Sequence, residues 1–257
     1  TRGSAPLAGL TLYDQEKYTE AHRAFDGALD AGFHHAARFW RGWTALRLER
    51  NAEALADFDA VLADPNHRGA FDFELDLGRA EALIELNRDA EALPALDRAK
   101  TYGSQDARVP GYRSLALRKL ARPAAALAAA EDSLSLKPDY DWAQMQKALS
   151  LFTLARYGEA IDAIDPLLDV KYRRRFLMIQ KAEAALRLGK PRAALETLRA
   201  RRELYRVDLQ YSLAIIQTQC ALGNQAEAER HRRDALRLFP TVTWLSPALA
   251  EHGWRCP

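Results

Sequence analysis

The 257-residue chain is 48% hydrophobic and 28% charged, a composition typical of a soluble folded protein with a sizeable core. Its 37 basic and 35 acidic residues nearly balance, which excludes a general electrostatic attraction to nucleic acid or to an anionic membrane. Two cysteines are too few for a disulfide framework, and no apolar run is long enough to cross a bilayer. Neither a disulfide-stapled scaffold nor a membrane-inserted protein is therefore expected.

The charges are distributed unevenly along the chain. Residues 1–100 contain 12 basic and 18 acidic residues, whereas residues 171–257 contain 17 basic and 8 acidic residues. Basic residues cluster in the segments 171–175, 199–202 and 230–233, which we interpret as solvated helix ends and outer faces. The alternative is an acidic partner of the C-terminal half: a protein segment, an anionic polysaccharide or RNA phosphates. Nothing resembles a one-base-per-repeat RNA code, so nucleic acid is not an expected partner.

A single pattern of residues recurs down the chain. It has the form Leu-x-x-Tyr-x-Glu-Ala at residues 154–160, and its last alanine returns at intervals of 33, 38 and then 34 residues. These anchor alanines are Ala21, Ala54, Ala92, Ala126, Ala160, Ala194 and Ala228. Twelve positions earlier stand Gly9, Gly42, Ala80, Ser114, Ala148 and Ala182, and four positions later stand Phe25, Phe58, Leu96, Ala130, Ile164 and Leu198. The chain is therefore an array of tandem repeats.

Each repeat contains two amphipathic helical patterns separated by a short polar break, as in 140–154 followed by 157–168. Helix-breaking residues mark these breaks, namely Asn87, Pro123, Gly158, 189–191 and 223–224. A small residue on the first helix and the anchor alanine on the second would let the two helices approach closely. Each repeat is thus predicted to be a helical hairpin.

In chain order the predicted units are 2–35, 35–68, 73–106, 107–140, 141–174, 175–208 and 209–242. Four extra residues around 69–72 lengthen the link between the second and third units. The last unit has Ile216 where a small residue is expected and Arg232 where an apolar residue is expected, which predicts looser packing there. Residues 243–257 follow as a cap and tail. Ser246 and Pro247 favour the start of a capping helix over 243–252.

The small residue, the anchor alanine and the bulky residue after it resemble the tetratricopeptide repeat family, whose period is 34 residues. The resemblance extends over about seven repeats in residues 2–242, although the tryptophan usual early in the first helix is missing. It implies an all-α, right-handed superhelical solenoid of helix-turn-helix repeats with a C-terminal capping helix.

The family implies that the first helices line a concave groove and bind partners at the second, fifth, ninth, twelfth and thirteenth positions of each unit. Our binding candidates at these positions are Phe39, Trp43, Leu46, Arg47, Arg118, Lys119, Trp142, Met145, Phe152, Phe176 and Arg187. The same positions also hold Leu77, Glu81, Ile84, Glu85, Arg108, Leu115, Leu149, Ile179 and Glu183. An apolar groove of this kind is typical of peptide binding, unless the curvature of the stack buries several of these side chains.

No catalytic or nucleotide-binding motif is present, so we expect no enzyme activity, cofactor or metal. The leading hypothesis is a scaffold or adaptor that holds a peptide or partner protein in the groove. The alternatives are a bacterial envelope module that contacts a polysaccharide or a membrane-associated complex, and self-association through an uncapped end. Because the sequence begins at Thr1 without methionine, we expect that the native N-terminus has been processed, trimmed or cut from something longer. We expect a soluble protein of the bacterial cytoplasm or periplasm, and the sequence does not decide between these compartments.

Overall fold

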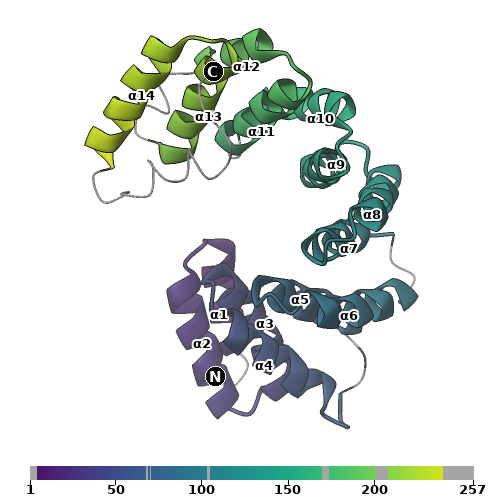
Figure 1. Ribbon diagram of the computed structural model, residues 1–257. Coiled ribbons are helices and arrows are strands. Elements are labelled where there is room, and N and C mark those ends of the chain that lie inside the picture. The colour runs from purple at the N-terminus through teal and green to yellow at the C-terminus, as the bar shows by residue number, and fades with distance from the viewer. Residues whose placement is uncertain are drawn as a thin grey trace. The chain divides into compact units, whose positions relative to one another are not determined.

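The computed structural model describes residues 5–67, 69, 71–102, 105–169, 174–200 and 208–239. These residues form fourteen α-helices and one 3-10 helix and contain no strand (Figure 1). The prediction of an all-α array of helical hairpins is confirmed. The predicted capping helix over 243–252 lies outside the described residues. No helix in the described ranges combines the length and the apolar character needed to span a bilayer.

The helices pair in sequence order, so that each hairpin has an odd-numbered first helix and an even-numbered second helix. Their bounds are α1 (Ala5–Asp14), α2 (Tyr18–Asp30), α3 (His34–Arg47), α4 (Asn51–Leu62), α5 (Asp72–Glu85), α6 (Asp89–Thr101), α7 (Arg108–Lys119), α8 (Pro123–Leu136), α9 (Asp141–Thr153), α10 (Tyr157–Ile164), α11 (Arg174–Arg187), α12 (Pro191–Arg199), α13 (Leu209–Ala221) and α14 (Gln225–Leu238). The 3-10 helix η1 (Asp165–Asp169) extends α10.

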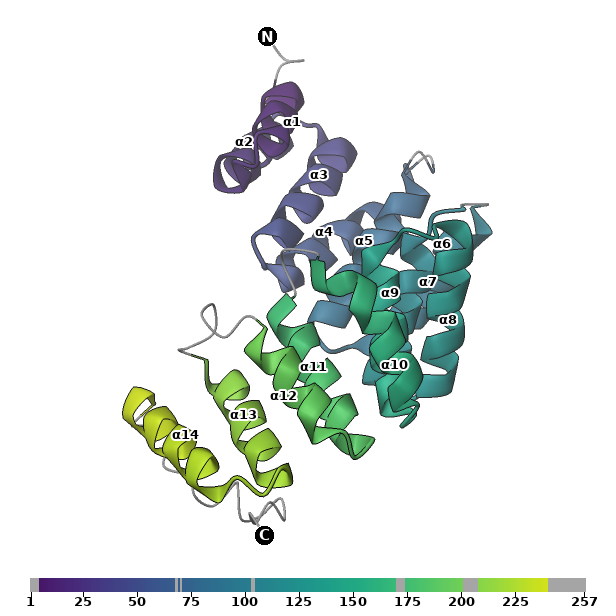
Figure 2. The same cartoon turned by 90° about the horizontal axis from the view of Figure 1, so that it is seen from above.

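The chain divides into two compact units, Thr1–Gln146 and Lys147–Pro257, and the boundary falls inside α9. In the first unit every helix from α1 to α8 packs against the next, and in the second unit the same holds from α10 to α14 (Figure 2). The first helices also contact one another: α1 with α3, α3 with α5, α5 with α7, and α11 with α13. Each unit therefore presents a surface made by neighbouring first helices, which we call its first-helix face.

The turn inside each hairpin has one repeated backbone geometry. A residue with positive φ lies five positions before each anchor alanine, at Glu16, Glu49, Asn87, Ala121, Ala155, Gly189 and Gly223. The following N–H group donates back to a carbonyl five residues earlier, for example from Arg50 to Ala45 at 2.8 Å. This bond satisfies a carbonyl that the helix end leaves open. Gly158, which the sequence indicated as a break, instead lies inside α10, and Ala155 makes the turn.

The anchor alanines lie where the two helices of a hairpin are closest, and all seven are buried, with at most 2% of their surface exposed. The small residue on the first helix faces the bulky residue on the second. A Cβ atom added to Gly42 would lie 2.7 Å from the ring of Phe58, and one added to Gly9 would lie 2.5 Å from the ring of Phe25. Glycine therefore occurs where the facing residue is phenylalanine.

The last hairpin has neither the small residue on its first helix nor the bulky apolar residue on its second helix. Ile216 takes the place of the small residue and is 2% exposed, in a cluster with Cys220 and Ala228. Arg232 takes the place of the bulky apolar residue and pairs with Glu229 at 2.8 Å.

Candidate functional site

A row of partly exposed side chains crosses the first-helix face of the first unit. The rings of Tyr13 on α1 and Trp40 on α3 meet edge to face, with centroids 5.7 Å apart. Arg47 at the end of α3 donates to the Tyr13 hydroxyl at 3.5 Å. Further along, the Tyr112 hydroxyl of α7 bonds to the Glu81 carboxylate of α5.

Trp142 of α9 ends this row, with its ring centroid 5.0 Å from that of Tyr112. The indole lies over Gly111, where an added Cβ would come within 2.5 Å of the ring. The row of Tyr13, Trp40, Arg47, Glu81, Tyr112 and Trp142 thus draws on five successive first helices; we call it the first-helix row. It combines aromatic surface with charge of both signs, which suits recognition of a polypeptide.

The ionisation of this row departs from that of free side chains. Burial raises the pKa of the Glu81 carboxyl, more than the Tyr112 bond and the nearby Arg47 lower it. Burial is also the main reason that the pKa of Tyr112 is raised above its usual value. The bond to Tyr13 raises the pKa of Arg47, which therefore remains charged. The row thus contains a partly buried carboxyl, on the first helix α5, whose pKa is raised.

Four of the eleven binding candidates are instead buried in the core, as are Leu77, Ile84 and Leu149 at the other groove positions. Phe39 is 3% exposed and stacks on Phe71 with ring centroids 4.6 Å apart. Trp43 is 7% exposed and meets Phe58 at 5.7 Å. Leu46 and Met145 are 8% and 4% exposed. These side chains support the first-helix face from beneath and offer little surface to a partner.

Two predicted basic residues on α7 also interact within the protein. Lys119 bonds to the backbone carbonyl of Ile84 and pairs with Asp89 at 3.2 Å. Arg118 is half-buried and donates to the Gln146 side chain at 3.4 Å. Burial lowers the pKa of Arg118, with Asp89 acting weakly in the opposite direction. Lys119 thus links α7 to the end of α5 and the start of α6.

The remaining predicted residues lie in the second unit. Phe152 is half-buried and packs edge to face on Tyr157, with centroids 5.4 Å apart. Phe176 is 41% exposed, and Arg187 is exposed and pairs with Glu183 at 3.4 Å. Phe176 lines a cavity of about 180 Å³ between α11 and α13, and so does Glu183, the partner of Arg187.

That cavity lies on the first-helix face of the second unit, since all of its walls come from α11 and α13. It is lined by Phe176, Ile179, Gln180, Ala182, Glu183, Leu186, Gln210, Leu213, Ala214 and Gln217. Phe176, Ile179 and Glu183 are groove residues predicted from the sequence, whereas the three glutamines are not. The sequence spacing could have identified two of these glutamines, because Gln210 and Gln217 are seven residues apart and so share one helix face.

In the first unit, Tyr13, Trp40 and Tyr112 are not among the groove residues predicted from the sequence. Trp40 lies seven residues before Arg47, and Tyr112 lies four residues after Arg108, so each shares a helix face with a predicted position. This helical spacing could have identified both residues. Their contacts across helices required the structure.

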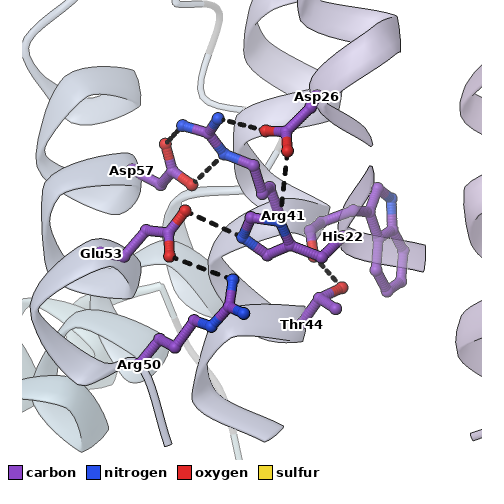
Figure 3. A network of polar contacts seen from close by, with 8 residues as sticks. His22, Asp26, Arg41, Thr44, Arg50, Glu53 and Asp57 are labelled. Carbon is purple, nitrogen blue, oxygen red and sulfur yellow. Dashed lines mark hydrogen bonds and ion pairs between the residues drawn. The ribbon is translucent and has the colours of Figure 1, made fainter. Parts of the chain in front are cut away.

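A polar network on the other side of α3 holds this helix in place. Figure 3 shows Arg41 between Asp57 of α4 and Asp26 of α2, with His22 and Glu53 beside it. The guanidinium donates two bonds to Asp57, at 2.6 and 2.7 Å, and one to Asp26 at 2.7 Å. The bond to Asp57 raises the pKa of Arg41 above its usual range. Arg41 thus joins α3 to α2 through Asp26 and to α4 through Asp57, whose side chain is buried.

The arginines of α14 pair with acidic residues about one helical turn earlier. On α14, Arg230 pairs with Glu227 at 2.5 Å and Arg232 pairs with Glu229 at 2.8 Å. Arg237 lies 3.9 Å from Asp234. Residues 171–173 and 201–202 of the other basic runs lie outside the described residues.

Two histidines meet near the lengthened link between the second and third hairpins. The rings of His35 and His67 are 5.8 Å apart, and each pairs with an aspartate, Asp64 at 2.7 Å and Asp72 at 2.5 Å. A bond from the Asn66 backbone and the contact with His35 lower the pKa of Asp64. Over the described ranges, no group of three or more His, Cys, Asp or Glu side chains is placed to hold a metal ion.

Comparisons with known proteins agree with the hairpin array. A tetratricopeptide repeat model matches residues 7–68 and 44–107. No curated protein matches the chain. Among solved structures, a tetratricopeptide repeat protein from Parabacteroides merdae is 15% identical, with a TM-score of 0.67 over 97% of each chain.

Two further solved structures share the fold at low identity. The pilF protein of Pseudomonas aeruginosa is 18% identical, with a TM-score of 0.66 over 82% of this chain and 94% of its own. MamA from Desulfovibrio magneticus is 14% identical, with a TM-score of 0.62 over 67% of this chain and 97% of its own. From its repeat register, its paired helices and these matches, the chain has the fold of the tetratricopeptide repeat proteins, and the family's model matches its first hairpins.

Proposed function

We propose that this protein is a non-catalytic scaffold or adaptor that binds a peptide or partner protein on its first-helix faces. The observation that carries the proposal is the first-helix row, in which aromatic and charged side chains from five first helices are joined and partly exposed. Aromatic and arginine side chains in such a position are the residue types that contribute most to protein interfaces.

The burial of four predicted residues refines this proposal. Phe39, Trp43, Leu46 and Met145 act through the shape of the face, because their side chains are enclosed by the core. Contact with a partner falls to exposed or half-buried residues, namely Arg47, Trp142, Phe152, Phe176 and Arg187, with Arg118 contributing through its exposed part. Lys119 also supports the face, because its ammonium group is already paired.

Selection of peptides from a random phage-displayed library on the full chain, followed by calorimetry with the synthesised peptides, tests this function. Arg47→Ala removes an exposed contact of the row and should weaken binding about tenfold or more. Arg122→Ala is the matched control, because Arg122 is an exposed arginine at the start of a second helix. Equal binding by both variants and by Trp142→Ala would contradict binding at the first-helix row.

An acidic partner of the C-terminal half is the second candidate function, favoured by the excess of basic over acidic residues in 171–257. The ion pairs of α14 weaken the positive electrostatic potential of Arg230 and Arg232. Salt dependence separates the two functions. Binding of an acidic partner should weaken steeply as salt is added, whereas binding at an aromatic surface should change little.

A further inference from the structure

The cavity between α11 and α13 combines apolar walls with unpaired amide side chains. Phe176, Ile179, Leu186 and Leu213 supply the large apolar surfaces. An apolar cavity of about 150 Å³ holds a benzene ring. The volume of about 180 Å³ between these helices therefore accommodates one large apolar side chain.

Three glutamines complete the lining. Within the part of the chain that the structure describes, the side chains of Gln180, Gln210 and Gln217 make no hydrogen bond to the protein. Each amide offers both a donor and an acceptor. A backbone peptide group has the same two functions, so these side chains match the main chain of an extended polypeptide, whatever its side chains are.

The charge of the lining restricts the occupant further. Glu183 is the one charged residue among the ten that line the cavity, and Arg187 pairs with it at 3.4 Å. Arg175, at the start of α11, is likewise paired with Asp208 at 2.7 Å. A charged side chain entering this site would lose its hydration without gaining a free counter-ion. The cavity therefore favours an uncharged segment.

We propose that the α11–α13 cavity binds an uncharged, extended segment of a partner protein, whose apolar side chain enters between Phe176, Ile179 and Leu213 while its main chain bonds to the three glutamines. The proposal rests on the proposed function as a partner-binding scaffold and adds the site and the chemistry of the partner. It is independent of the first-helix row in the first unit.

The experiment uses peptides enriched by the full chain from a random library, synthesised with acetylated and amidated ends and labelled for fluorescence anisotropy. Phe176→Ala truncates a 41% exposed side chain and should weaken binding about tenfold or more. Leu188→Ala is the matched control, because Leu188 is 39% exposed beyond the end of α11 and does not line the cavity. This control should bind with unchanged affinity.

Two further changes test the chemistry and do not depend on the core. Gln210 is exposed, so Gln210→Glu places a charge at the cavity without removing buried contacts, and it should weaken binding by a similar factor. On the peptide, N-methylation of the amide next to the apolar residue removes a main-chain donor. This should lower affinity for the wild type but have less effect on Gln210→Ala.

The outcomes separate the two proposals. Loss of binding in Phe176→Ala and Gln210→Glu, with retention in Leu188→Ala, supports the cavity. Peptides whose binding survives in Arg47→Ala are the ones that report on the cavity; if these are charged, or bind Phe176→Ala as tightly as wild type, the cavity proposal is overturned. If every enriched peptide instead loses binding in Arg47→Ala, the scaffold function stands without this site. If no peptide is enriched, both proposals fail.

Discussion

At the scale of single residues, the small residue on a first helix and the bulky residue opposite on the second helix together set how closely a hairpin closes. Gly42 lies against the ring of Phe58, which is fully buried. In the fourth hairpin the small residue is Ser114, whose hydroxyl instead bonds to the carbonyl of the anchor Ala126 at 2.7 Å. Packing by size in one hairpin is thus replaced by a hydrogen bond in another.

Gly42→Ala should lower the free energy of unfolding by about 1–3 kcal/mol, because the new Cβ would overlap the Phe58 ring in a closely packed core. Gly27→Ala is the control. Gly27 lies within α2 with open space around it, and alanine there should raise stability by about 0.5–1 kcal/mol. Urea unfolding measures both. If Gly42→Ala is as stable as wild type, the close approach of glycine to phenylalanine is not required.

The pKa of Glu81 predicts a pH dependence of stability. A carboxyl whose pKa is raised by burial favours the folded state below its unfolded pKa, and this contribution is lost as the pH rises through its folded pKa. Glu81→Gln keeps the bonding partner of Tyr112 without the charge. The variant should therefore be more stable than wild type at pH 7, and the difference should shrink as the pH falls through the folded pKa and be nearly gone below about pH 4, under the unfolded pKa of glutamate.

Thermal unfolding across this pH range tests that sign, with Glu85→Gln as the control because Glu85 is an exposed neighbour on the same helix. The control should follow wild type closely. A Glu81→Gln variant that is less stable at pH 7 would show that Arg47 and Tyr112 stabilise the carboxylate by more than its burial costs.

At the scale of helices, consecutive hairpins are joined by a repeated ion pair that the sequence analysis did not identify. A basic residue on a first helix pairs with an aspartate on the helix before it, as in Arg41–Asp26, Arg79–Asp59, Arg113–Asp97 and Lys181–Asp165. In the last of these, the aspartate belongs to η1, which extends α10. These pairs hold α3, α5, α7 and α11 to the element before each of them.

The members of this series should differ in their contribution to stability. Arg41 also binds Asp57, whose side chain is 4% exposed, whereas the Asp59 side chain that binds Arg79 is 48% exposed. Arg41→Ala leaves a buried carboxylate unpaired and should cost about 3 kcal/mol, whereas Arg79→Ala should cost less than about 1 kcal/mol. Urea unfolding measures both. In the double variant Arg41→Ala/Asp57→Asn, part of the loss should be recovered, and equal losses in the two single variants would contradict the role of burial.

Helix pairing was predictable because it depends on residues that recur at fixed spacing. The anchor alanines and the small residues before them mark the contact inside every hairpin, and the structure places them there. The turns were less predictable. Ala121 and Ala155 adopt the left-handed backbone conformation that Gly189 and Gly223 adopt, and alanine carries no sequence signal for that conformation.

At the scale of the whole molecule, the site was predictable only as a surface. Repeat positions identify which residues of a first helix face away from its own hairpin, but not which of them the next hairpin covers. Trp43 and Trp142 occupy predicted groove positions, yet Trp43 is enclosed by Phe58 and Gly78, whereas Trp142 remains half-exposed on Tyr112. The difference arises from contacts between repeats, which the register of a single repeat does not contain.

The central claim is that partners bind the first-helix faces, and hydroxyl-radical footprinting of the full chain with and without a library-selected peptide tests it most directly. The method reports the exposure of side chains on both kinds of helix in one measurement. The exposed reporters on second helices are Leu136 and Leu238, with Tyr102 directly after α6, and they are 41%, 47% and 45% exposed. The account predicts that the peptide protects first-helix residues such as Phe176, Trp40 or Trp142 and leaves these three unchanged. Protection of Tyr102, Leu136 or Leu238 without protection of any first-helix residue would contradict it.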